Sequence, residues 1–200
     1  MIHLIREEEP EFWREFRAKN PGIHYDDLQK TPDGRMVRNR LREFNINQQY
    51  GLCAYCCRQI DNENSLNEHI KPRGLGEYSN LSMEYTNIIA SCKAEGADVT
   101  CSASKENKYD EMFISPLDED CEKFFEFYEN GEIVSDSPRG QYTINLLNLN
   151  SYKLCRARRA QLKACNSFRD PDLVRSIYLK PDDNHRLQPY ADIVKCFYGR

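Results

Sequence analysis

Residues 53–72 read CAYCCRQIDNENSLNEHIKP, and two features of this stretch decide the expected fold. Cys53 and Cys56 are separated by two residues, a spacing at which one turn can present two thiolates to a tetrahedral Zn²⁺ ion. Twelve residues after Cys56 the chain carries Glu68-His69, a carboxylate beside an imidazole. The stretch therefore predicts a small metal-bound core with reactive polar groups close by.

Such a zinc site needs two further ligands, and Cys92 and Cys101 are the natural candidates. The eight residues between them make a wider gap than a usual knuckle, so the connecting segment has to loop out. Cys57 leaves the second ligand open between Cys56 and Cys57, although Cys56 has the better spacing. A redox Cys-x2-Cys motif is the alternative, but it belongs in a βαβ unit, which this sequence does not predict.

The composition is that of a globular chain that buries a core. It has 200 residues, 40% of them hydrophobic and 30% charged, which suits one domain or a small core with helical additions. The nine cysteines cannot all pair within the chain, and no apolar run reaches the ~18 residues of a membrane span. We expect a cytoplasmic protein with no membrane partner. A net charge of −4 argues against a general nucleic-acid coat.

The predicted fold class is α+β and mostly helical. Apolar spacing and punctuation by Pro and Gly predict helices over 7–18, 34–49, 102–112, 138–149, 151–169, 171–179 and 188–198. Short strands are predicted at 58–60 and 66–70, and a short helix or turn at 84–92. The dipeptide Asn130-Gly131 predicts a hairpin between 124–128 and 132–134.

These elements divide the chain into three consecutive parts. We expect an N-terminal helical arm over residues 1–50, the metal-bound core over 51–112, and a hairpin with a C-terminal helical region over 113–200. All three would form a single compact domain.

The Glu-His pair suits phosphodiester hydrolysis, which requires a base for water and a positive charge for the developing anion. An imidazole, with an ordinary pKa near 6.5, can serve as that base. Adjacent residues of a strand point to opposite faces, so Glu68 and His69 need a bend to converge on one phosphate. We expect His3, His24 and His185, which have no such companions, to be structural.

Four segments together resemble a known family. They are Cys53-x2-Cys56, Leu66-Asn67-Glu68-His69-Ile70-Lys71-Pro72, Asn87-Ile88-Ile89-Ala90-Ser91-Cys92 and Cys101-x3-Lys105. In this order they resemble the HNH endonucleases, and more narrowly the PtuB-like HNH subunit of Septu and retron anti-phage systems. With weaker matches on either side, the resemblance extends over roughly residues 35–165.

The resemblance implies a ββα-metal (HNH) core in which a catalytic cation lies between a hairpin and a helix. His69 would be the general base, and Glu68 a ligand of the cation, Mg²⁺ or Mn²⁺. Asn87 would hydrogen-bond the backbone and hold the His-bearing loop. The four cysteines, Cys53, Cys56, Cys92 and Cys101, would form a separate structural zinc site.

One position departs from the family pattern. Where such proteins usually carry Asn or His after the last cysteine, this chain has Ser102, a poor ligand for a hard cation. If 102–112 is a helix, Glu106 lies on nearly the same face as Ser102. We expect Glu106 to supply the missing carboxylate.

Several basic residues are candidates for contacts with nucleic acid. Lys71, Arg73 and Lys105 flank the central motifs. Further along, Arg156 and Arg159, with Lys153 and Lys163, line one face of a predicted helix. That stripe is either a solvated helix face or a surface that follows the phosphate backbone.

The leading interpretation is a metal-dependent HNH endonuclease, acting on DNA or a structured RNA such as tRNA, as effector of an anti-phage defence complex. The resemblance also implies an ABC/SMC-like ATPase partner and, in some systems, a reverse transcriptase with its DNA–RNA product. The alternative is a zinc-stabilised adaptor without catalysis, which Ser102 favours. A zinc-ribbon transcription or translation factor would be expected to be more basic.

Overall fold

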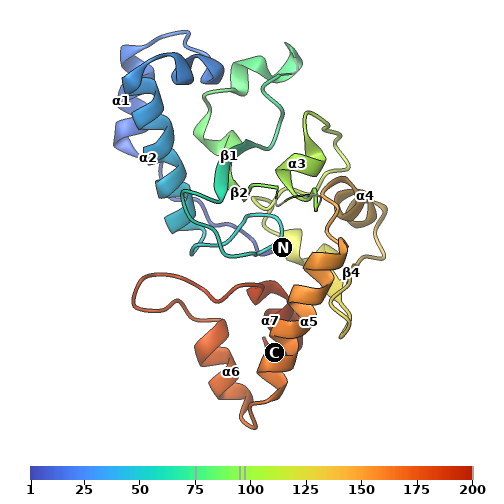
Figure 1. Cartoon of the computed structure of the whole chain (residues 1–200). Helices are drawn as coiled ribbons and strands as arrows, with labels where there is room; N and C mark the ends of the chain where they lie inside the picture. Colours follow the sequence, from blue (N-terminus) through green and yellow to red (C-terminus); the bar gives the residue numbers. More distant parts are fainter. Residues whose placement is uncertain (75, 95, 97, 200) are drawn as a thin grey trace.

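The computed structural model describes residues 1–74, 76–94, 96 and 98–199 (Figure 1).

The two N-terminal helices begin at residues that favour the first turn of a helix. Helix α1 (Glu11–Lys19) follows Pro10, and α2 (Pro32–Gln48) has Pro32 in its first turn. The Thr31 hydroxyl caps α2 by accepting a hydrogen bond from the Gly34 amide at 3.0 Å. The 3-10 segment η1 (Tyr25–Lys30) lies between the two helices.

The centre of the molecule is an antiparallel pair of strands, β1 (Ser65–His69) and β2 (Ile88–Cys92). Their register places Ser65 opposite Cys92 and His69 opposite Ile88. The segment that joins them contains η2 (Gly76–Leu81) and η3 (Tyr85–Asn87). The sequence-based helix or turn over 84–92 was wrong beyond residue 87, because β2 is buried on both faces and shows no alternation of polar and apolar residues.

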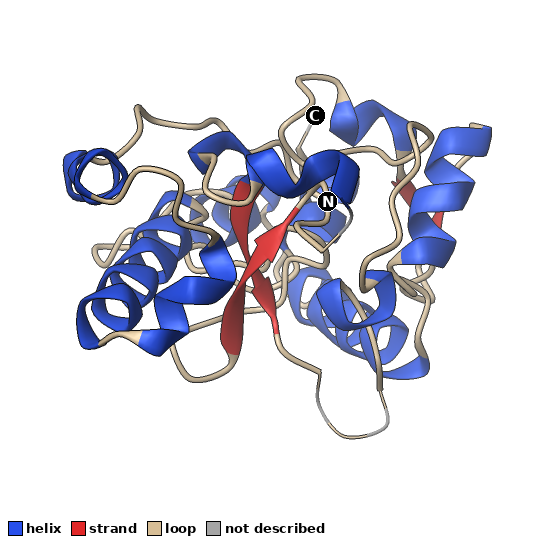
Figure 2. Ribbon diagram, turned by 90° about the horizontal axis from the view of Figure 1, so that it is seen from above, coloured by secondary structure: helices blue, strands red, loops and turns tan. Residues whose placement is uncertain are grey.

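This strand pair separates two apolar cores. Ile88 belongs to a cluster built from α1, η1 and α2, with Trp13, Tyr25 and Leu41. The next residue, Ile89, belongs to the main cluster, which includes the cysteine turn and the C-terminal helices. Successive strand residues point to opposite faces, so β2 contributes to both cores. In Figure 2 the strands lie in the middle, with helices on both sides.

The elements around the strands are shorter than predicted. Helix α3 is a single turn, Ser102–Lys105, and ends at Glu106, whose φ of 52° is left-handed. The helix expected over 102–112 is therefore largely absent. The strand expected at 58–60 is reduced to one bridge, between Leu52 and Gln59.

The second hairpin pairs β3 (Glu126–Phe127) with β4 (Ile133–Val134), after the 3-10 turn η4 (Cys121–Phe124). Gly131, with φ 89°, occupies its tight turn. A Cβ atom there would lie 2.1 Å from the Cys155 carbonyl oxygen. Glycine is therefore required twice, for the turn and for the close approach of a helix.

The remaining chain is helical: α4 (Pro138–Leu146), α5 (Tyr152–Asn166), α6 (Pro171–Tyr178) and α7 (Ala191–Tyr198). Each of these four helices lies within the range predicted from the sequence and is shorter than that range by one to four residues. Figure 1 shows α5, α6 and α7 grouped in the lower half, apart from α1, α2 and β1 in the upper half. None of the helices among the described residues has the length and apolar character needed to cross a bilayer.

Candidate active site and metal centre

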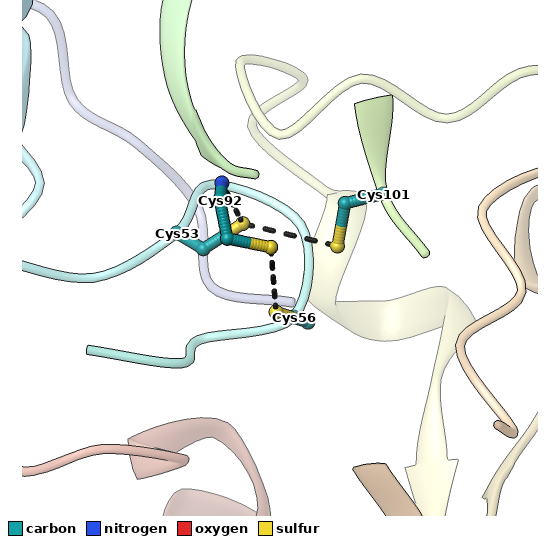
Figure 3. A group of neighbouring side chains, drawn as sticks. All are labelled: Cys53, Cys56, Cys92 and Cys101. Carbon is teal, nitrogen blue, oxygen red and sulfur yellow. Dashed lines mark hydrogen bonds between the residues drawn. The ribbon is translucent and has the colours of Figure 1, made fainter. Parts of the chain in front are cut away.

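Four cysteines from three parts of the chain meet in one buried cluster. Cys53 and Cys56 lie on the turn after α2, Cys92 ends β2, and Cys101 precedes α3. Their Sγ atoms all lie within 4.8 Å of one another, and the Cys53–Cys101 and Cys56–Cys92 pairs are 3.9 Å apart. A tetrahedral ion with Zn–S bonds of about 2.3 Å separates its sulfurs by roughly 3.8 Å. The four side chains turn toward one another (Figure 3) and could hold a metal ion, as a zinc site requires.

The structure also settles which residue of the pair Cys56-Cys57 joins the cluster. Cys57 has a left-handed backbone, φ 56°, and its side chain packs with Leu52 and Ala191 instead. Burial raises the pKa of the Cys57 thiol well above its usual value. Cys56 is therefore the member of the cluster that could hold a metal ion, and Cys57 is a core residue.

His69 lies at the end of β1 on the side of α2 and η1, opposite Ile88. Its ring is buried, 2% exposed, and meets the Tyr25 ring edge-on at 4.6 Å. The Nε2 atom lies 2.8 Å from the Ser82 carbonyl oxygen, which can only accept, so Nε2 carries the proton. The Nδ1 atom accepts from an Arg73 amino group at 3.2 Å. The imidazole is thus held in one tautomer, with its lone pair on Nδ1.

The surroundings of His69 also keep the ring neutral. Burial, followed by the charges of Arg73 and Lys105, lowers the pKa of His69 to about 4, although the bond to Ser82 acts in the other direction. At neutral pH the ring therefore has an acceptor nitrogen, as a base requires.

Asn87 holds the segment that follows His69. Its amide oxygen accepts from the Lys71 backbone N–H at 2.8 Å, and its amide nitrogen donates to the Lys71 carbonyl at 2.9 Å. A further bond to the Leu81 carbonyl measures 3.2 Å. One buried side chain thus connects the two ends of the loop between β1 and β2. This is the loop that the family resemblance predicted Asn87 to hold.

Glu68 lies on the other face of β1, toward α3 and the cysteine turn. Its Oε1 accepts from the Tyr55 hydroxyl at 3.2 Å and is paired with the Lys105 ammonium at 3.0 Å. Lys105 is fully buried and also donates to the His69 carbonyl at 2.9 Å. Burial raises the pKa of Glu68, and Lys105 and Tyr55 offset part of that rise. Both residues lie in the paired part of β1, and their side chains have different hydrogen-bond partners in this structure.

The residues expected to bind the catalytic cation have other partners in this structure. The Ser102 hydroxyl is buried and donates to the Cys92 carbonyl at 3.5 Å. Glu106 lies outside α3, is exposed, and faces Lys108 at 3.7 Å, so the argument that placed it on the face of Ser102 fails. In the part of the chain that the structure describes, the cysteine cluster is the one group of three or more potential ligands, and Glu68 is not in such a group. The positive charge beside Glu68 is that of Lys105.

The basic residues are distributed over different places. Lys71 and Arg73 are half-buried beside the His69 loop, and the Lys71 ammonium lies 5.3 Å from the centre of the Tyr78 ring. Lys105 is buried, so it cannot contact a phosphate as the sequence suggested. Arg156 and Arg159 are exposed residues of α5. Helix α5 lies below β1 in Figure 1.

Several groups at the site were missed from the sequence. Tyr25, Asp26 and the Ser82 carbonyl surround His69, and Tyr55 binds Glu68. The Tyr25 hydroxyl also contacts β1, because it accepts a hydrogen bond from the Asn67 side-chain amide at 2.7 Å. These groups come from segments that are distant in the sequence, so they form no motif. The position of a backbone carbonyl, such as that of Ser82, also leaves no signal in a sequence.

Comparison with known proteins gives one informative match. No protein-family profile matches this chain. A protein of Escherichia coli described as "Retron Ec83 putative HNH endonuclease" is 27% identical over 205 aligned positions, which cover 81% of this chain and 79% of that protein. This similarity supports an HNH endonuclease family for the chain, and the narrower PtuB-like assignment stays a proposal.

Proposed function

We propose that this chain is an HNH-type endonuclease that hydrolyses phosphodiester bonds of nucleic acid, with His69 as the general base. The observation that carries the proposal is the state of that imidazole. Its proton is fixed on Nε2 by the Ser82 carbonyl, and its lone pair is on Nδ1, beside a partly exposed arginine. An acceptor nitrogen next to a cation is what a general base for phosphodiester hydrolysis needs.

The residues around His69 suit a phosphate. Asn87 fixes the backbone of Lys71, so the strand end and the loop after it keep their relative positions. Arg73 and Arg38 both lie over the Tyr25 ring, at 5.2 and 5.7 Å, and bring two guanidinium groups to the same side of the strand. Such groups bind phosphate oxygens in pairs and would place the phosphodiester near Nδ1.

Two metals belong to the proposal in different ways. Zn²⁺ fits the four-cysteine cluster and would be structural. For the Mg²⁺ or Mn²⁺ ion implied by the family resemblance, no group of three His, Cys, Asp or Glu ligands includes Glu68 among the described residues, and Lys105 supplies a positive charge there. A requirement for Mg²⁺ or Mn²⁺ therefore stays a prediction. Adding each ion in turn to the cleavage assay tests it.

The biological setting is likewise proposed. The similar protein is named as part of a retron, which favours a role as effector of an anti-phage defence complex. An ABC/SMC-like ATPase and a reverse transcriptase with its DNA–RNA product would then be partners. The exposed basic face of α5, with Arg156 and Arg159, is available either to the substrate or to such a partner.

Two contacts favour a second function. The buried Glu68–Lys105 pair and the bonded Ser102 hydroxyl occupy the positions expected for the catalytic cation. In that form the chain would act as a zinc-stabilised adaptor that binds partners without cutting. The state of His69, which an adaptor does not need, favours the nuclease.

The test is a cleavage assay with matched histidine variants. Wild type, His69→Ala and His185→Ala would be incubated with plasmid DNA and with total tRNA, in Mg²⁺ or Mn²⁺, alone and with a co-purified ATPase. His185 is exposed and far along the chain from His69, so His185→Ala controls for loss of any histidine. We expect cutting by wild type and His185→Ala and none by His69→Ala. Equal cutting by His69→Ala would remove His69 as the base, and no cutting by any zinc-loaded form would favour the adaptor.

A further inference from the structure

Arg73 joins two groups that lie far apart in the sequence. One of its amino groups donates to His69 Nδ1 at 3.2 Å, and its Nε donates to the Asp26 carboxylate at 2.8 Å. Asp26 belongs to η1, next to Tyr25, whose ring packs against His69. The guanidinium therefore bridges the proposed base and a carboxylate of another segment.

This bridge covers the base. His69 is 2% exposed, whereas the side chains of Arg73 and Asp26 are 36% and 53% exposed. The nitrogen that would take a proton from water is thus reached past Arg73. While an N–H of Arg73 occupies the Nδ1 lone pair, that lone pair cannot accept a proton from water.

The partner of Arg73 has the chemistry of the ligand that would replace it. A carboxylate and a phosphodiester each offer two anionic oxygens to the planar guanidinium, and both are bound in the same forked way. Because the side chains of Asp26 and Arg73 are about half exposed, their ion pair contributes little free energy and can be exchanged easily.

We propose that Arg73 is a cover displaced by substrate: a phosphodiester takes the guanidinium from Asp26, and the same movement frees His69 Nδ1. Asp26 is then a positioning residue that sets how readily the exchange occurs. The proposal rests on the function proposed above and describes how substrate would regulate that activity. The base is unmasked only when a phosphate is present, so water is not activated without substrate.

The test follows the imidazole itself. Nitrogen-15 spectra of zinc-loaded protein would record His69 Nδ1 for wild type, Arg73→Gln, Asp26→Asn and Asp172→Asn, with increasing dimethyl phosphate as the probe. Asp172 is the matched control, because it forms an exposed pair with Arg175 at 2.6 Å on α6. Neutral imidazole nitrogens shift measurably when the lone pair loses a hydrogen bond.

We expect Arg73→Gln to show an unbonded Nδ1 without phosphate. Wild type and Asp172→Asn should reach that state as dimethyl phosphate is added, and Asp26→Asn should reach it at about two- to five-fold lower concentration, the range of an exposed ion pair. An Nδ1 signal in Arg73→Gln that is unchanged from that of wild type would overturn the contact. Equal titration of Asp26→Asn and wild type would remove Asp26 from the exchange.

These outcomes are separate from catalysis. If the spectra behave as expected but no nucleic acid is cut, the phosphate-responsive contact stands and the nuclease function falls. If cutting depends on His69 but the spectra do not respond, the function stands and the cover is wrong. In an active enzyme, Asp26→Asn should lower KM by the same two- to five-fold factor and leave kcat nearly unchanged, about the effect of one exposed pair.

Discussion

At the scale of single residues, the candidate site depends on how one imidazole is partnered. The Ser82 carbonyl fixes the proton on Nε2, Tyr25 packs against the ring, and Arg73 occupies Nδ1. The ring has no carboxylate partner among these contacts, and burial disfavours its charged form. A neutral His69 is therefore part of the folded state, which has a consequence for stability.

We predict that His69 makes the protein sensitive to acid. Its pKa is about 4 in the folded state and near 6.5 when unfolded, so its contribution to stability is complete above pH 6.5 and is lost as the pH falls through 4. The difference amounts to at most about 3 kcal/mol. Urea unfolding of wild type and His69→Gln between about pH 7.5 and 4.5 measures it, because Gln does not titrate. The stability of wild type should fall relative to the variant, and parallel pH profiles would contradict the assignment.

At the scale of elements, the short helix α3 is tied to β1 by a buried ion pair. Lys105, at the end of α3, is bonded to the Glu68 carboxylate and the His69 carbonyl. An unpaired charge at this depth is costly, so each partner requires the other. The pair explains why a one-turn helix, too short to be stable by itself, has a defined place against the strand.

We predict strong coupling between Lys105 and Glu68. Lys105→Met should lower the free energy of unfolding by about 3–5 kcal/mol, because it leaves the Glu68 carboxylate buried and unpaired. Adding Glu68→Gln should recover much of that loss. Chemical unfolding of the four forms of this cycle measures the coupling.

The control is Lys108→Met, which removes an exposed ammonium 3.7 Å from Glu106. It should change stability by less than about 0.5 kcal/mol. If the effects of Lys105→Met and Glu68→Gln simply add, the two side chains are not a pair in solution.

At the scale of the whole molecule, the four cysteines join three segments that lie far apart in the sequence. They link the turn after α2, the end of β2 and the start of α3, and the cluster lies within the main apolar core. Cys53 and Cys101 are 48 positions apart, so one ion would close long loops of chain. Metal binding and folding should therefore be coupled.

We predict that Cys56→Ser loses bound zinc and that Cys57→Ser retains one zinc per chain. Elemental analysis of purified protein measures the metal, and thermal unfolding measures its effect. The melting temperature of Cys56→Ser should fall by at least about 10 °C, as should that of wild type treated with a strong chelator. Zinc loss in Cys57→Ser with retention in Cys56→Ser would reverse the assignment.

The sequence predicted what depends on neighbours in the chain. The Cys-x2-Cys spacing indicated the cysteine cluster, Asn130-Gly131 the second hairpin, and the Pro-delimited apolar repeats the C-terminal helices. Each of these signals is local, because ligand spacing, turn conformation and helical periodicity act over a few residues. The positions of His69 and Asn87 near one loop also followed from the sequence, through the resemblance to a family.

Only the tertiary structure decided what depends on distant partners. It gave β2 its strand conformation by pairing with β1, selected Cys56 over Cys57, buried Lys105 against Glu68, and placed Asp26 and the Ser82 carbonyl around His69. The physical reason is common to all of these. Strand pairing, the pairing of buried charges and the tautomer of an imidazole are set by groups that meet only after the chain has folded, and the spacing of residues along the chain does not encode them.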